Sequence, residues 1–104
     1  MRPTGHLDML LLAVLVGTPR HGYAVIEALR SRSDGTFDLP EGSVYPALHR
    51  LEDAGLVESR WAEVDGRRRR VYRLTGAGAT ALAERRQAWT QFATGVEAVL
   101  GWSA

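Results

Sequence analysis

The sequence of 104 residues contains no cysteine, which excludes disulfide bonds, thiolate zinc sites and cysteine nucleophiles together. Long apolar runs are missing as well. The longest, Met9–Val16, is too short to span a bilayer, and no signal-peptide cleavage site accompanies it. We therefore expect a soluble, untargeted, cytoplasmic protein without a membrane partner.

Lysine is also absent, so all 13 basic residues are arginines. The formal net charge is only +1, but six arginines lie in the segment 60–73, where Glu63 and Asp65 are the acidic residues. This segment therefore carries +4 and the rest of the chain −3. A concentrated arginine segment favours phosphate binding, whereas the alternative is a simply solvated charged surface.

The size and composition of the chain indicate a single domain. Hydrophobic residues make up 45% and charged residues 24%, which is ordinary for a soluble globular protein. A chain of this length buries roughly 60 to 65% of its unfolded surface, so its core is thin. A dimer interface would be a natural supplement to such a core.

The first third of the chain predicts two helices. Residues 7–16 are apolar nearly all round, which is typical of a helix buried on more than one side, and Gly17–Pro19 end it. A short amphipathic helix follows over residues 21–33. Its expected apolar stripe consists of Tyr23, Val25, Ile26 and Leu29.

A third helix is expected over Ser43–Ala54. Ser43 is the predicted N-cap, Pro46 falls in the first turn, and Gly55–Leu56 predicts a Schellman-type end. The spacing assigns Val44, Leu48 and Leu51 to the buried face. The outward face then consists of Tyr45, Pro46, His49, Arg50 and Asp53.

Two strands, over residues 57–64 and 70–74, are predicted around Asp65–Gly66, a strong signal for a two-residue hairpin turn. Thr75 is the expected N-cap of a last helix over residues 76–100. That helix carries a heptad-like apolar seam, interrupted at Arg85, which needs a partner. The seam consists of Leu82, Trp89, Phe92, Val96 and Val99.

This order of elements predicts a mainly α fold with a small β-hairpin, a winged helix-turn-helix over residues 1–75. Residues 76–104 form the expected dimerisation helix, packed on the same domain. In the winged helix-turn-helix, the third helix enters the DNA major groove and the hairpin, or wing, contacts phosphates or the minor groove.

Three segments resemble the PadR-like family of transcriptional regulators: LLLAVLVGTPRHGYAVIEALR, LPEGSVYPALHRLEDAGLV and GRRRRVYRLTGAGATAL. The resemblance covers Leu7–Leu82 and implies a dimeric winged-helix repressor. It also implies that the last helix of each protomer packs against the first helix of the other. With its single C-terminal helix, the chain resembles the short subfamily of these regulators. Gly76 stands where the family commonly has proline.

Nine residues are predicted to contact DNA. On the third helix these are Ser43, Tyr45, Pro46, His49 and Arg50, and on the hairpin Arg67, Arg68, Arg69 and Arg70. The alternatives are a solvated helix face and a solvated hairpin tip. Strand alternation separates Arg68 and Arg70 from Arg67 and Arg69, so only some of the four should touch DNA. Tyr72 and Leu74 are assigned to the core.

Aromatic residues of the last helix allow two hypotheses. Trp89, Phe92 and Trp102 either pack in the core of a dimer or form the walls of a pocket for a small planar aromatic effector. Some relatives bind planar compounds between such helices. The expected interface or pocket residues are Met9, Ala13, Leu82, Trp89, Phe92, Val96 and Val99.

No enzymatic or metal-binding motif is present. The histidines, His6, His21 and His49, lie on three separate elements, and no cofactor is expected. His21 is placed to cap the second helix or to contact a phosphate. We expect a homodimeric repressor of palindromic operator DNA, released by an aromatic ligand. The alternatives are a winged-helix protein-interaction module and a regulator of another winged-helix family.

Overall fold

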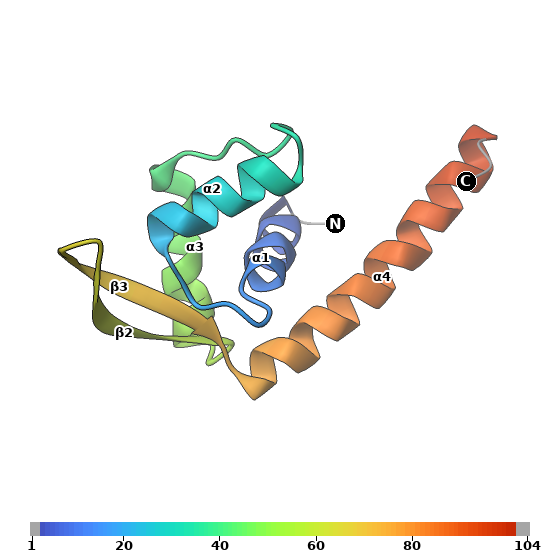
Figure 1. Cartoon of the computed structure of the whole chain (residues 1–104). Coiled ribbons are helices and arrows are strands. Elements are labelled where there is room, and N and C mark those ends of the chain that lie inside the picture. Colours follow the sequence, from blue (N-terminus) through green and yellow to red (C-terminus); the bar gives the residue numbers. More distant parts are fainter. Residues whose placement is uncertain (1–2, 102–104) are drawn as a thin grey trace.

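The computed structural model describes residues 3–101, which form four helices and a small antiparallel sheet (Figure 1). The elements in chain order are α1 (Pro3–Val14), β1 (Arg20–His21), α2 (Gly22–Arg32), α3 (Glu41–Asp53), β2 (Val57–Val64), β3 (Arg67–Leu74) and α4 (Gly76–Leu100). The hairpin of β2 and β3, here called the wing, projects from one side of the helical body, and α4 projects from the other.

The core lies where α1, α2 and α3 meet the base of the sheet. Its largest fully buried side chains are Leu11, Leu12, Leu15, Val25, Val44, Leu48, Leu51, Val57 and Tyr72. No charged or polar residue among the described residues is fully buried. The expected buried face of α3 is confirmed, with Ala47 added to it.

Helix α1 begins earlier and ends earlier than the sequence predicts. It stops at Val14, and residues 15–17 form turns in which the N–H of Leu15 donates to the carbonyl of Leu12. Arg20 Nε donates to the Val14 carbonyl oxygen at 2.8 Å. An unpaired carbonyl at the helix end is thereby satisfied by a side chain from the next element.

Helix α2 matches its predicted range to within one residue at each end, and the predicted cap is confirmed. His21 is the N-cap, and its Nδ1 accepts a hydrogen bond from the N–H of Ala24 at 3.3 Å. The assignment of Tyr23 to the buried stripe is wrong, because its side chain is 52% exposed. Each three-residue step rotates a helix face by about 60°, so Tyr23 lies about 120° away from buried Leu29.

The predicted N-cap of α3 is also wrong. Pro40 holds the N-cap position without a side-chain hydrogen bond, and Glu41 opens the helix, which puts Ser43 in the first turn. Pro46 consequently lies in the second turn, where it has no N–H to donate to the preceding turn. The predicted end is confirmed: the N–H groups of Gly55 and Leu56 donate to the carbonyls of Glu52 and Leu51, both at 2.9 Å.

The sheet has three strands in the order β1-β3-β2, all antiparallel. The hairpin turn at Asp65–Gly66 is confirmed, and both residues have positive φ, at 52° and 75°. This geometry is that of the tight turns preferred in two-residue hairpins. Strand β3 begins at Arg67 rather than at residue 70, so the arginine run belongs to the strand.

Helix α4 has its predicted bounds, and its start is tightly attached to the body. The Thr75 hydroxyl accepts from the N–H of Gly78 at 3.0 Å and donates to the carbonyl of Gly55 at 2.7 Å. A Cβ on Gly78 would collide with the carbonyl oxygen of Leu56. Only glycine therefore fits this crossing of α4 over the turn between α3 and β2.

The rest of α4 leaves the body (Figure 1). Gly78 and Leu82 are its buried residues, both near its start. The described chain measures 51 × 28 × 23 Å, and its radius of gyration of 14.9 Å exceeds the value of about 13 Å typical of a compact domain of this size. The long helix accounts for the difference.

Candidate nucleic-acid interface

The exposed face of α3 carries Ser43, Pro46, His49 and Arg50, as predicted. Tyr45 differs, because it is half-buried and packs against the core. Its ring lies over the start of α2, where a Cβ added to Gly22 would be 2.6 Å from Tyr45 Cζ. The expectation that Tyr45 points fully outward is wrong, since glycine at position 22 leaves space for the ring.

Arg50 is held by an acidic residue of α1. Its Nη2 lies 3.1 Å from Asp8 Oδ1, and the Asp8 side chain is only 17% exposed. This ion pair joins residues 42 positions apart in the sequence. It fixes the orientation of the exposed arginine on α3 and ties α3 to α1.

The register of β2 and β3 divides the wing into two faces. The face toward α3 carries Ser59, Trp61, Glu63, Arg68, Arg70 and Tyr72, and the outer face carries Glu58, Arg60, Arg67, Arg69, Val71 and Arg73. The predicted alternation of the four arginines is confirmed. Tyr72 is buried and Leu74 packs against the core, as expected. Burial raises the pKa of Tyr72, and nearby Glu52 raises it further.

The arginines of the wing have different surroundings. The Arg70 guanidinium reaches α3, with Nε donating to Ser59 Oγ at 2.8 Å and Nη2 lying 3.8 Å from Glu52 Oε2. The Arg68 guanidinium lies over the Trp61 ring, 4.9 Å from its centroid, a distance suited to cation–π attraction. Arg67, at the tip, is exposed.

Arg69 is half-buried, and its Nε is buried without a hydrogen-bond partner among the described residues. Its charge acts on the N-cap of α2. Burial lowers the pKa of His21, and the positive charge of Arg69 lowers it further, against a smaller opposite effect of Asp65. The lowered pKa favours the neutral imidazole, which is the form in which Nδ1 can accept the capping hydrogen bond.

The part of α4 that follows Arg85, here called its far part, presents an exposed apolar face. Trp89 makes an edge-to-face contact with His6 of α1, at 5.3 Å between ring centroids, and lies 5.8 Å from the Phe92 ring. Phe92, Val96 and Val99 are exposed, and a shallow hollow lies between them and Gly95. Met9 and Ala13 are half-buried against the core.

A model of the transcriptional regulator PadR-like family matches residues 11–84 of the chain. The chain belongs to this family. Members are transcriptional regulators and not enzymes, in agreement with the sequence prediction. Among the described residues, no three histidine or carboxylate side chains come together as a metal site, and no helix could cross a membrane.

Relatives of this PadR-like chain agree with that assignment. The transcriptional regulator Rv3488 of Mycobacterium tuberculosis is 46% identical over 74 residues, which cover 71% of this chain and 56% of that protein. The PadR-like transcriptional regulator BC4206 of Bacillus cereus has a similar structure, with a TM-score of 0.82, 27% identity and 95% coverage of both chains.

A PadR family transcriptional regulator from Eggerthella lenta is also similar in structure, with a TM-score of 0.77 and 33% identity. The similarity covers 92% of this chain and 82% of that chain. The long C-terminal helix therefore belongs to the architecture that this PadR-like chain shares with its structural neighbours.

Two residues of the predicted α4 seam and pocket differ from the others. Leu82, expected at the interface of a dimer, is 3% exposed within its own protomer, so the assignment is wrong. Heptad spacing brought Leu82 into the seam, although α4 still packs on the body at that point. Trp102, the third aromatic residue of the predicted pocket, lies outside the described residues.

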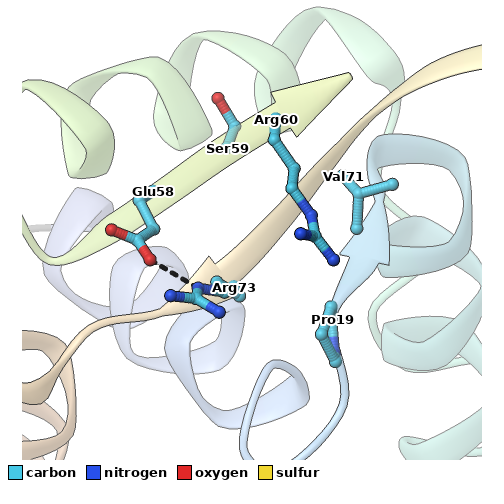
Figure 2. Close-up of a pocket in the computed structure, with 6 residues that line it drawn as sticks. All are labelled: Pro19, Glu58, Ser59, Arg60, Val71 and Arg73. Atoms are coloured by element: carbon cyan, nitrogen blue, oxygen red, sulfur yellow. Dashed lines mark hydrogen bonds and ion pairs between the residues drawn. The ribbon is translucent and has the colours of Figure 1, made fainter. Parts of the chain in front are cut away.

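Sequence reasoning missed a small cavity on the outer face of the wing base (Figure 2). The cavity has a volume of about 180 Å³ and is lined by Pro19, Glu58, Ser59, Arg60, Val71 and Arg73. Arg73 is paired with Glu58, whereas the Arg60 side chain extends along Val71 toward Pro19. The strand period assigns the outer face to Glu58, Arg60, Val71 and Arg73, whereas the side chain of Ser59 belongs to the opposite face. The segment that leads into β1 brings Pro19 to this face.

Proposed function

We propose that this PadR-like regulator is a repressor that binds palindromic operator DNA as a homodimer. The observation that carries the proposal is the direct attachment of an arginine-rich wing to the helix that presents His49 and Arg50. Side chains of this kind read base edges, and arginines on an adjoining hairpin bind phosphates. A protein-interaction module would instead present an apolar patch on these surfaces.

In this proposal α3 lies in the major groove. Its contacts with bases and phosphates come from Ser43, Tyr45, Pro46, His49 and Arg50, and those of the wing from Arg67, Arg68, Arg69 and Arg70. Tyr45 is half-buried, so its phosphate contact would be made by its hydroxyl from beside the start of α2, where that group lies. Residues up to 75 form the DNA-binding unit, and α4 holds the dimer.

The dimer is supported by the apolar far part of α4. Trp89 and Phe92 are 41% and 49% exposed, and Val96 and Val99 continue the same seam. Within one chain this face makes the Trp89–His6 contact but stays largely exposed, whereas two copies would bury it on each other. The two copies of α3 would then reach successive major grooves about 34 Å apart.

The proposal is tested by selecting preferred duplexes from a random pool and titrating them by fluorescence anisotropy at several salt concentrations, with light scattering for the oligomeric state. We expect a dimer that prefers a palindrome over a scrambled duplex by at least about 1,000-fold. With about three phosphate contacts per protomer, the slope of log affinity against log salt should be near −5.

Two variants test whether the wing supplies the phosphate contacts. Replacing Arg67, Arg68 and Arg69 by alanine should weaken all DNA binding and flatten the salt slope, whereas Arg86→Ala on α4 should change neither. Equal, weak and salt-erased binding of the wild type to every duplex would refute the proposal. The winged-helix protein-interaction module would then be the function to test. A reporter gene placed under the control of the selected operator, and measured with and without the regulator, distinguishes repression from activation.

A second role, binding of a planar aromatic effector, is favoured by the adjacent rings of Trp89 and Phe92. In a dimer these rings would face a second pair across a flat apolar space. The probe 8-anilinonaphthalene sulfonate should bind the dimer saturably and lower its affinity for the operator. Equal affinity of the probe for free and DNA-bound dimer would refute a regulatory role, since only differential binding shifts an equilibrium.

A further inference from the structure

Three polar side chains connect the last turn of α3 with the wing. The Ser59 hydroxyl donates to Glu52 Oε2 and accepts a hydrogen bond from Arg70 Nε at 2.8 Å. Arg70 Nη2 also lies 3.8 Å from Glu52 Oε2. Glu52 stands on α3, Ser59 on β2 and Arg70 on β3, so one small cluster contacts all three elements. We refer to these residues as the α3–wing bridge.

The bridge continues toward the tip through an aromatic ring. The Arg70 guanidinium carbon lies 5.4 Å from the centroid of Trp61, and Arg68 lies 4.9 Å from the same centroid. Arg70 is therefore held by Ser59 and Glu52 at one end and contacts Trp61 at the other. Nε and Nη2 of Arg70 thus face groups of its own chain, whereas Arg68, among the described residues, lies only over the Trp61 ring.

We infer that Arg70 is a positioning residue, which with Ser59 and Glu52 sets the angle between the wing and α3. The inference rests on the proposed function for its effect on DNA. The two eight-residue strands span about 26 Å, so a tilt of about 10° at the base moves the tip by about 4.5 Å. That displacement is larger than a hydrogen-bond length and would separate Arg68 from a phosphate when α3 is in the groove.

The substitution Glu52→Gln, which removes one negative charge from the bridge, tests this inference. If Glu52 were only a bystander, its carboxylate would repel DNA phosphates, and Glu52→Gln would strengthen binding to every duplex. If the bridge sets the wing angle, Glu52→Gln should instead lower the preference for the operator over a scrambled duplex. Glu84→Gln, an exposed acidic residue on α4, is the matched control for the loss of one negative charge.

Ser59→Ala removes the hydroxyl that connects the other two residues without changing any charge. We expect it to weaken operator binding about tenfold, the effect of one charge-assisted hydrogen bond, and to leave scrambled-duplex affinity within about twofold. Arg68→Ala should weaken both and reduce the salt slope by about 1.8 for a dimer. Ser59→Thr, which keeps the hydroxyl, should restore operator preference, and Ser31→Ala on α2 should have no effect.

A measurement without DNA separates the bridge from the function. In the ¹⁵N relaxation of the free protein, Ser59→Ala should lower the heteronuclear NOE of Gly66 at the wing tip, and Ser59→Thr should restore it. A wing that stays equally rigid in Ser59→Ala overturns the inference, as does an equal loss of operator and scrambled binding. Absence of operator preference in the wild type would refute the proposed function, while the relaxation data still decide the bridge.

Discussion

The start of α4 and its far part belong to one continuous helix but relate to the rest of the chain in opposite ways. At the start, Thr75 caps the helix, Gly78 crosses a neighbouring carbonyl closely, and Leu82 fills the core. Beyond Arg85 the side chains that would fill a core are exposed, with Val99 at 89%. A helix can thus be fixed by its first turns and offer the remainder to another molecule.

The largest effect is expected from Gly78→Ala. The added Cβ would collide with the Leu56 carbonyl oxygen and lie 2.8 Å from Leu74 Cδ1, so α4 must detach or shift. We expect a loss of more than about 3 kcal/mol in unfolding free energy, measured by urea denaturation. Gly95→Ala, in the far part where no atom lies within 4 Å, should leave the fold intact. Equal effects of both changes would contradict the comparison.

Leu82→Ala should have the next largest effect on stability. Truncation of this buried side chain removes core contacts within the protomer, at a cost of about 2–3 kcal/mol. Because the loss is intramolecular, the unfolding free energy should fall by the same amount at every protein concentration, once dimer dissociation is accounted for. A loss seen only at concentrations where the protein is dimeric would place Leu82 in the interface after all.

The double change Trp89→Ser with Phe92→Ser should act on association instead. Two exposed aromatic side chains per protomer would lose their burial, and the dimer dissociation constant should rise by at least about 100-fold. Sedimentation equilibrium measures it, with Arg86→Ala as the control on the same helix. An unchanged dissociation constant would mean that another surface holds the copies together.

The smallest predicted effect is a pH dependence of the folding stability that arises from His21, the N-cap of α2. The pKa of His21 is lowered in the folded state, so the unfolded chain binds the proton more readily. The stability linked to His21 is complete above its unfolded pKa of about 6.5 and is lost as the pH falls through the lower folded pKa. His21→Asn keeps a capping acceptor and should flatten this dependence below about pH 6.5. Parallel curves for both proteins in thermal denaturation would contradict the assignment.

Local backbone chemistry explains which elements were predictable. The Asp65–Gly66 turn, the Gly55–Leu56 helix end and the Thr75 cap depend on a few neighbouring residues, and each is where the sequence indicates it. Strand β1 has only two residues and pairs through β3, so no periodic pattern could reveal it. The N-cap at Pro40 lacks the side-chain hydrogen bond by which caps are recognised.

The candidate site was predictable as a set of residues but not as a set of contacts. Helical spacing and strand alternation assign the exposed faces of α3 and the wing correctly, except for half-buried Tyr45. They cannot tell that Arg50 meets Asp8 on α1 or that Arg70 meets Ser59, because those partners come from other elements. Heptad spacing likewise cannot distinguish a residue buried in the core of its own protomer, such as Leu82, from a residue that packs against a second chain.

The two-residue turn of the wing makes its length adjustable. Gly66 has no heavy atom within 4 Å of where its Cβ would be, and Val64 and Arg67 pair directly beside it. Adding one residue to each strand would extend the tip by about 3.3 Å without touching the core, although it would exchange the faces of the added side chains. An insertion of two residues per strand would preserve the faces, so the reach of the wing can diverge among related proteins while the helical body stays unchanged.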